Sequence, residues 1–263
     1  MRFAIGLEYD GSAFLGWQLQ RQQPTVQGCL EKAIGRVADH EVRLHCCGRT
    51  DTGVHALCQV AHFDSPAERS ERSWVLGINT HLPPAAAVLW LRRVDENFHA
   101  RFSAFSRSYR YRILDRPVRP GLDAARVGWS RKPLHTGRMH QAAQYLLGEH
   151  DFSAFRASAC QARHAVREVQ DISVTREGQE VVIDITANGF LYHMVRNVAG
   201  SLMRIGRGDE APDWIQHVLD SCDRSRAAPT AVASGLYFLG ARYPAEYDLP
   251  GAVSDFPVRE TTR

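Results

Sequence analysis

Short runs with a two-residue hydrophobic repeat alternate with longer stretches of helical repeat along this 263-residue chain. Such runs predict strands, and stretches with apolar residues three or four apart predict helices. In the first part of the chain they predict, in order, a strand at 2–9, a helix at 25–39, strands at 41–46 and 57–63, a helix at 70–78 and a strand at 87–94. The order β-α-β-β-α-β is that of a ferredoxin-like unit.

The second part of the chain repeats this order approximately. Its expected elements are a strand at 106–114, a helix at 136–147, strands at 166–175 and 181–187, helices at 190–205 and 212–220, and a strand at 235–242. We therefore predict an α+β protein with two ferredoxin-like units, residues 1–105 and 106–245, whose mostly antiparallel sheets pack closely around a cleft. Residues 246–263, rich in Pro and Gly, are expected to form an extended C-terminal tail.

A hydrophobic content of 44% is sufficient for the core of a globular chain. The longest uninterrupted apolar run, Ala85–Leu91, is far shorter than the roughly 20 residues that a membrane-spanning helix needs. Glu8 and Asp10 interrupt the N-terminal segment before the apolar region of a signal peptide could form. We therefore expect a cytoplasmic protein without a membrane partner.

The cysteines give no indication of a disulfide framework or a zinc ribbon. There are six, and none forms a C-x-x-C pair, so reduced thiols are expected. A metal set of Cys46 or Cys47 with His55, Cys58 and His62 can be drawn, but it requires strand and loop positions to converge. We predict no metal site.

Residues 48–56 read GRTDTGVHA and place Arg49 and Asp51 in one short loop. The ordinary interpretation is a turn, with glycines for tight backbone and an aspartate that caps it. The alternative is a functional carboxylate, because the loop connects two apolar strands that would hold Asp51 rigidly.

Basic and aromatic residues gather in the middle of the chain. Between Arg101 and Lys132 there are nine basic and two acidic residues. Within this strip, the strand at 106–114 (SRSYRYRIL) alternates strictly, with its tyrosines on one face and Arg110 and Arg112 on the other. Tyrosines can stack on bases and arginines can hold phosphates, so the strip is a candidate RNA-binding surface.

Arg196 lies near the start of the helix predicted over 190–205. A cation nearby keeps a shielded aspartate ionised, so that the carboxylate can act as nucleophile or base. Arg196 is therefore a candidate partner of Asp51. It could equally bond a local carbonyl group or Asp184, and the sequence leaves both possibilities open.

Several long segments follow one another over nearly the whole chain: LEYDGSAFLGWQLQ, TVQGCLEKAI, CGRTDTGVHALCQVAHFD, NTHLPP, FHARFSAFSRSYRYRI, LLGEHDFSAFRA, ANGFLYHMVRN and APTAVASGLYF. In this order they resemble the TruA family of tRNA pseudouridine synthases. One departure is Thr52, where the family loop reads GRTDAGVHA. It affects the expected shape of the loop and not the aspartate.

The resemblance implies an isomerase that converts uridine to pseudouridine at tRNA positions 38, 39 and 40 in the anticodon stem-loop by base flipping. It implies that Asp51 is the catalytic aspartate, with Arg196 paired to it. It implies that Tyr109 stacks on the target uracil and that Arg49 enters the stem as the nucleotide turns out. Because the isomerisation consumes no electrons or water overall, no cofactor or metal is implied. The implied partners are tRNA and a second copy of the chain in a homodimer, and the implied fold has a central active-site cleft.

Three other functions remain open from the residues alone. A non-catalytic RNA-binding module would use the same aromatics and arginines. A metal-dependent hydrolase would use His55, His62 and either Asp51 or Asp64. A related pseudouridine synthase would act on other RNA sites.

Overall fold

The computed structural model describes residues 1–21 and 23–250. They form two compact units, here called unit 1 and unit 2. Unit 1 comprises Met1–Ser106 together with the chain from Tyr237, and unit 2 comprises Arg107–Leu236. Unit 1 is therefore assembled from both ends of the described chain.

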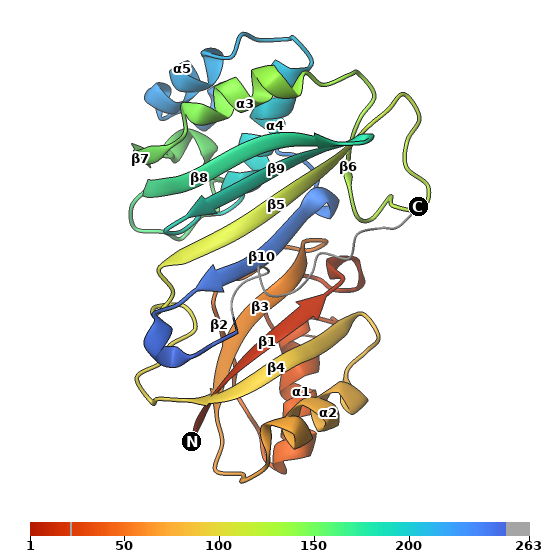
Figure 1. The fold of residues 1–263 in the computed structure, drawn as a ribbon, viewed down its shortest axis with the longest axis vertical. Helices are drawn as coiled ribbons and strands as arrows, with labels where there is room; N and C mark the ends of the chain where they lie inside the picture. The colour runs from red at the N-terminus through yellow and green to blue at the C-terminus, as the bar shows by residue number, and fades with distance from the viewer. Residues whose placement is uncertain (22, 251–263) are drawn as a thin grey trace. The chain divides into compact units, whose positions relative to one another are not determined.

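The sheet of unit 1 is built around β1 (Arg2–Tyr9), which pairs antiparallel with both β3 (His55–Asp64) and β4 (Ala86–Val94). The short β2 (His45–Cys46) also pairs antiparallel with β3. The last strand, β10 (Leu236–Arg242), pairs in parallel with β3 (Figure 1). From Tyr237 on, this strand belongs to unit 1, and the expected division into residues 1–105 and 106–245 stays a prediction.

Two helices, α1 (Val26–Ala38) and α2 (Glu71–His81), belong to unit 1 and begin at side-chain caps. The Thr25 hydroxyl accepts the Gly28 N–H, and the Ser70 hydroxyl accepts the Ser73 N–H. These caps satisfy backbone donors that have no partner within the helix. Apolar stripes then fix the buried faces of the helices: Leu30, Ile34, Trp74 and Ile78 are fully buried.

The sheet of unit 2 begins with β5 (Ser106–Asp115), which pairs antiparallel with β9 (Glu180–Ala187). Next to β9 lie β8 (Val166–Glu177) and then β7 (Gly148–Asp151), each antiparallel to its neighbour. The short β6 (Gly128–Ser130) pairs in parallel with β5. The predicted hairpin is confirmed: β8 and β9 are joined by a turn that contains Gly178 at a positive φ of 60°.

Unit 2 contains α3 (Thr136–Gln144), α4 (Met194–Gly206) and α5 (Trp214–Ser221). The most buried of these helices is α4, of whose 13 residues ten are buried. Two of the ten are polar: the Asn197 amide donates to the Phe155 carbonyl, and the Ser201 hydroxyl accepts the Ala228 N–H at 3.3 Å. A buried polar side chain is costly unless it has a partner, so these two side chains fix what packs against α4.

The largest differences from the sequence-based expectation concern four elements; in addition α3 ends three residues earlier and α2 three residues later than expected. The strand expected at 41–46 is reduced to β2, because the Leu44 N–H bonds the Glu31 carboxylate at 2.9 Å. The helix expected from 190 begins at Met194, because His193 has a left-handed backbone with φ 61°. The short strands β6 and β7 were not predicted, since three or four residues are too few to show a repeat.

Both units combine helices with mostly antiparallel strands, which confirms the predicted α+β class. Within residues 1–21 and 23–250, no helix has the length and apolar character needed to cross a membrane. Of the predicted tail, residues up to 250 include part of a short 3-10 turn, Ala245–Tyr247, and residues 251–263 lie outside the described part of the chain.

Candidate active site

The loop between β2 and β3 carries Arg49 and Asp51 on unit 1. Arg49 is exposed and Asp51 is half-buried. The Asp51 carbonyl accepts the Val54 N–H at 3.1 Å, and Gly53, with φ 80°, closes this turn. Val54 is only 2% exposed, so the loop is anchored at its end nearest to β3. The tight turn expected from the two glycines is therefore present.

Hydrogen bonds from β1, β3 and the N-terminal segment hold the backbone of this loop. The Tyr9 hydroxyl at the end of β1 lies 2.7 Å from the Thr50 hydroxyl, directly before Asp51 in the chain. The Thr50 carbonyl accepts the Trp17 N–H at 2.9 Å, and the Gln59 side-chain amide donates to the Gly48 carbonyl at 2.8 Å. Burial raises the pKa of Tyr9, so its hydroxyl keeps its proton. These bonds fix the backbone on both sides of Arg49.

Two glycines of the N-terminal segment YDGSAFLGW approach this loop more closely than any other residue type could. A Cβ atom at Gly11 would lie 2.0 Å from the Val54 carbonyl oxygen. At Gly16, where φ is +78°, it would lie 2.8 Å from the Thr50 carbonyl oxygen. The sequence reasoning missed both residues, although the D-G and L-G-W turns could have signalled a close backbone contact.

His55 is structural in this arrangement. Its side chain is nearly fully buried, its Nδ1 accepts the Gly11 N–H at 3.1 Å, and its ring stacks on Tyr237 of β10 at 4.7 Å. The imidazole thus joins the loop to the N-terminal segment and to the last strand. The hydrolase alternative, which requires His55 to act on a metal, finds no support in this geometry.

Tyr109 lies on β5 of unit 2, opposite Ile185 of β9. It is half-exposed, and its ring meets the edge of Phe190 at 5.0 Å with an angle of 80° between the planes. A buried ring, Tyr111, follows on the same face two residues later. The predicted alternation of β5 is therefore confirmed, and Phe190 limits the positions that the Tyr109 ring can take.

Arg196 lies in the first turn of α4 and bonds the segment that precedes β10. Its Nε donates to the Ala231 carbonyl at 2.8 Å, and its own carbonyl accepts the Ala231 N–H at 3.1 Å. Burial raises the pKa of the Tyr111 hydroxyl, and the positive charge of Arg196 opposes that rise. The bond to a local carbonyl, one of the two roles left open, is thus observed; Asp184 pairs with Arg110 instead.

Next to Arg196, Asn197 links α4 to the same segment. Its amide nitrogen donates to the Phe155 carbonyl at 2.7 Å, and its amide oxygen accepts the Thr230 hydroxyl at 2.6 Å. Arg224 also donates to that oxygen, at 3.1 Å. The sequence segments HMVRN and APT, more than 30 residues apart, therefore meet through partly buried hydrogen bonds beside Arg196.

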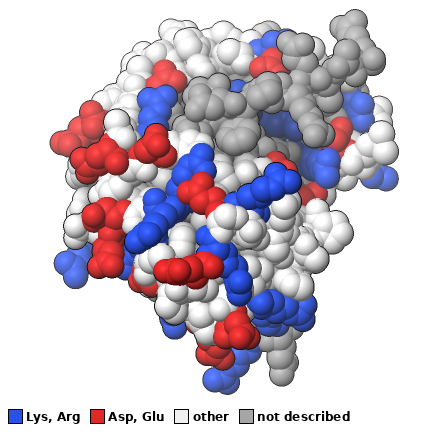
Figure 2. Space-filling model, turned by 60° about the horizontal axis from the view of Figure 1, so that its bottom comes forward, with Lys and Arg blue, Asp and Glu red and all other residues white. Residues whose placement is uncertain are grey.

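Part of the basic strip is neutralised within unit 2. Arg110 makes two hydrogen bonds to Asp184, and Arg112 makes two to Glu180, all at 2.8 Å. These are cross-strand pairs between β5 and β9. On the face shown in Figure 2, basic and acidic side chains are likewise interspersed. The charge that the strip could offer to phosphates is thus smaller than the sequence count indicates.

The four predicted site residues fall into two groups, one on each unit. Arg49 and Asp51 share the loop of unit 1, and Tyr109 and Arg196 lie on unit 2.

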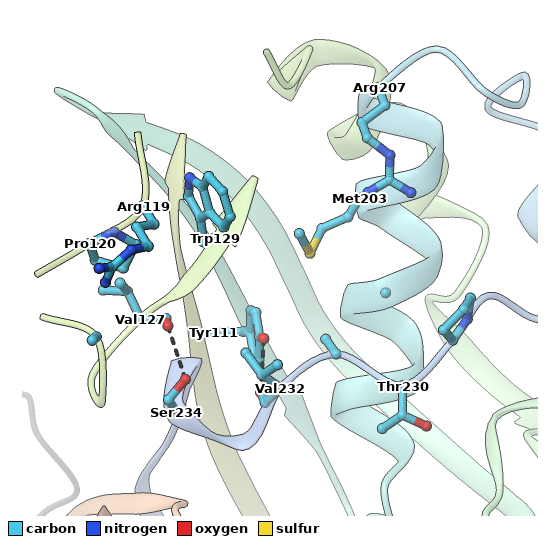
Figure 3. Close-up of a pocket in the computed structure, with 14 residues that line it drawn as sticks. Tyr111, Arg119, Pro120, Val127, Trp129, Met203, Arg207, Thr230, Val232 and Ser234 are labelled. Carbon is cyan, nitrogen blue, oxygen red and sulfur yellow. Dashed lines mark hydrogen bonds between the residues drawn. The ribbon is translucent and has the colours of Figure 1, made fainter. Parts of the chain in front are cut away.

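A separate cavity of about 490 Å³ lies within unit 2. Trp129 of β6 and Met203 of α4 point into it from opposite walls (Figure 3). The segment 229–234 forms a third wall of the cavity. Two hydrogen bonds hold this segment: the Tyr111 hydroxyl donates to the Val232 carbonyl at 2.9 Å, and the Ser234 hydroxyl donates to the Val127 carbonyl at 3.0 Å. None of the four predicted site residues is among those that line it.

Three histidines of unit 1 cluster beside β2. The ring of His62 on β3 lies 5.1 Å from that of His45 and 4.6 Å from that of His99. The Nδ1 of His62 accepts the Ala100 N–H at 3.1 Å, so this nitrogen carries no proton. Among the described residues, no three His, Cys, Asp or Glu side chains are grouped so that they could hold a metal ion.

The His62 ring makes the stability of unit 1 dependent on pH. Burial, with the charges of His99, Arg2 and His45, lowers its pKa from 6.5 to about 4, while Asp64 acts in the opposite direction. The folded chain therefore binds fewer protons than the unfolded chain between these values. The free energy of unfolding is therefore highest above pH 6.5, where His62 is neutral in both states, and it decreases as the pH falls towards 4.

We expect the free energy of unfolding to fall by an amount on the order of 2–3 kcal/mol over this range. Denaturant titrations at several pH values measure this slope. His62→Asn, which keeps an acceptor for the Ala100 N–H, should flatten it, and His217→Gln, at an exposed position of α5, should not. Equal slopes in wild type and His62→Asn would contradict the assignment.

Comparison with known proteins agrees with the resemblance seen in the sequence. A family model described as tRNA pseudouridine synthase matches residues 7–103 and 142–244. The tRNA pseudouridine synthase A of Xylella fastidiosa is 53% identical over 255 residues, which cover 97% of this chain and 99% of the relative. The proteins of the same name from Hydrogenovibrio crunogenus and Photorhabdus laumondii are each 51% identical, over 96% of this chain and 96% of the relative. A solved structure, a Cbf5-Nop10-Gar1 complex, aligns with a TM-score of 0.39 and 13% identity, covering 90% of this chain and 48% of that one.

Matches over nearly the full length, at more than half of all positions, define the class of protein: a pseudouridine synthase, which is an isomerase. Within that class, the chain belongs to the tRNA pseudouridine synthase family, as the ordered sequence segments predict.

Proposed function

We propose that this protein isomerises uridine to pseudouridine in the anticodon stem-loop of tRNA, with Asp51 as the catalytic aspartate. The observation that carries the proposal is the way unit 1 holds this residue. The carboxylate follows Thr50, whose buried hydroxyl bonds Tyr9, and precedes a turn closed by Gly53. Because the backbone on both sides of Asp51 is already fixed, positioning its carboxylate for reaction costs little further conformational entropy.

The proposed reaction breaks the bond between N1 of uracil and C1′ of the ribose, turns the base within the site and joins C5 to C1′. One proton leaves C5 and one is gained at N1, so product and substrate have the same composition. Attack of Asp51 at C1′, attack at C6, or removal of a ribose proton would each start this sequence. Tyr109 is a candidate base for the C5 proton.

We assign the remaining roles by the same resemblance. The target nucleotide is extruded from the stem, at a cost of a few kcal/mol that new contacts must offset. Arg49 enters the space that the nucleotide leaves, and its exposed position on the loop suits this role. Tyr109 stacks on the extruded uracil, and Arg196 pairs with the Asp51 carboxylate and keeps it ionised.

The larger assembly forms part of the proposal. We propose that the protein works in the cytoplasm as a homodimer and that its two halves are ferredoxin-like, with the active site in the cleft between them. The strand pairing supports the ferredoxin-like character of each half: β4, β1, β3 and β2 are successive antiparallel neighbours in unit 1, as are β5, β9 and β8 in unit 2.

Pseudouridine mapping tests the reaction and its target. Unmodified tRNA transcripts are incubated with the purified protein and sequenced after a pseudouridine-specific chemical treatment. We expect conversion confined to the anticodon arm. Conversion elsewhere would favour a related synthase with other targets, and a folded protein that binds tRNA but converts no uridine would favour the binding-module alternative.

We expect Tyr109→Phe to keep tRNA affinity and to slow product formation by about 10²–10⁴-fold, the range that general acid–base groups contribute. The variant retains the ring, its stacking face and its contact with Phe190, and loses only the hydroxyl. Single-turnover measurements with saturating protein separate the chemical step from binding. Normal turnover in this variant would leave Tyr109 with stacking alone.

A further inference from the structure

A second aromatic surface lies on unit 1, in the turn between β4 and β5. Phe102 is 75% exposed there, although its neighbours Phe98 and Ala100 are fully buried. The guanidinium of Arg101 lies over the Phe102 ring at 5.5 Å, and the His99 ring lies 4.4 Å from it. We call Arg101, Phe102 and His99 the Phe102 patch.

The turn that presents the Phe102 patch is held firmly. The Nδ1 of His99 faces the backbone N–H groups of Arg101 and Phe102, at 3.1 and 3.3 Å. The Ser103 hydroxyl accepts the His99 N–H at 2.9 Å. The carbonyl of Ala100, the residue before Arg101, accepts the Tyr243 hydroxyl at 2.7 Å. Phe102 is therefore exposed on an ordered support and not on a loosely held loop.

The patch lies near the strand that leads into the Asp51 loop. The His99 ring is 5.8 Å from that of His45 on β2, three residues before Gly48. Burial raises the pKa of the Cys46 thiol to about 12, and the positive charges of Arg49 and Arg101 both oppose that rise. Both arginines are therefore close enough to act on the same side chain.

The surroundings of the patch favour a nucleic acid over a protein. Arg101 and Arg49 are cationic, and the nearby carboxylate of Asp64 is held by Arg2 through two hydrogen bonds of 2.9 and 2.8 Å. An exposed aromatic ring beside a guanidinium group offers a face for a base and a charge for a phosphate. Another exposed side chain of this turn, Phe105 at 53%, is also aromatic and can likewise stack on a base.

We propose that an unpaired base of the tRNA stacks on Phe102 while Arg101 contacts an adjoining phosphate. The Phe102 patch is then an RNA-binding site of the protein, separate from the residues that act on the target uridine. The proposal rests on the proposed function only in taking tRNA as the ligand.

Equilibrium binding of an unmodified tRNA transcript, measured at several salt concentrations, tests it. We expect Phe102→Ala to weaken binding by about 5- to 100-fold, the effect of losing one stacked base, and to leave the salt dependence unchanged. Phe102→Trp should restore affinity. Arg101→Gln should instead reduce the slope of log affinity against log salt by about 0.7–0.9, the loss of one phosphate contact. The matched control is Leu76→Ala, which removes an exposed apolar side chain of α2 on the same unit, outside the basic strip.

Wild-type affinity in Phe102→Ala, or failure of tryptophan to restore it, would overturn the proposal. So would a change in oligomeric state of Phe102→Ala by sedimentation, because the ring would then serve a contact between protein chains. The binding and sedimentation measurements do not require the protein to convert uridine. If the wild type binds tRNA without forming pseudouridine, the proposed function fails while the stacking site is still tested.

Discussion

Asp51→Asn should abolish pseudouridine formation while the variant still binds tRNA. We expect the single-turnover rate to fall by at least about 1,000-fold, as removal of a nucleophile or general base does. Affinity should stay within about threefold of the wild type, because phosphate contacts dominate the binding of nucleic acids. Asparagine keeps the shape of the side chain, and the loop around it is fixed mainly by backbone bonds such as the one from Trp17 to Thr50.

The matched control is Asp39→Asn. Asp39 is an exposed residue of the same unit that ends α1 in a left-handed conformation, which asparagine also adopts readily. It should convert tRNA at the wild-type rate. A folded Asp51→Asn protein whose rate is within tenfold of the wild type would remove Asp51 from the chemistry.

Gly11→Ala should lower both the stability of the protein and its turnover, although Gly11 is not one of the predicted site residues. The added methyl group would lie 2.0 Å from the Val54 carbonyl oxygen and 2.4 Å from its carbon, which are backbone atoms with little freedom to move. We expect a loss of about 1–3 kcal/mol in the free energy of unfolding, as overpacking produces. Turnover should also fall, since the turn from Asp51 to Val54 must shift, whereas tRNA affinity should change little.

Chemical denaturation and single-turnover rates measure the two effects separately. Gly137→Ala is the control: nothing lies within 4 Å of the added carbon, and the residue lies in α3. There alanine should be neutral or stabilise by up to about 1 kcal/mol. Wild-type turnover in Gly11→Ala would show that the close contact does not position Asp51.

Much of the secondary structure could be predicted from the sequence because its periodicity is strong. The bounds of β1 agree with the prediction, and α1, from Val26 to Ala38, lies within one residue of the predicted helix at both ends. The prediction was wrong where a single contact overrides the repeat. Nothing in the sequence near Leu44 indicates that its N–H bonds Glu31, a residue of a helix 13 positions earlier.

The candidate site could be predicted only in part, because its residues and their support lie far apart in the sequence. Arg49 and Asp51 stand out by their spacing in a glycine-bearing loop. Gly11 does not, since its function depends on Val54, 43 positions later in the chain, and a sequence without the fold gives no distance between them. The bond between Arg196 and Ala231 is equally non-local.

The parallel pairing of β10 with β3 has a consequence for synthesis on the ribosome. A growing chain generally folds from its N-terminus as domains become available. Unit 1 cannot complete its sheet in this way, because Tyr237 and Phe238 pair with His55 and Ala56 only after more than 170 intervening residues have been made. The Tyr237 ring that stacks on His55 arrives at the same late stage. Nascent chains therefore carry the Asp51 loop without its full support, and the supported form of the loop first exists after Tyr237 and Phe238 have been made.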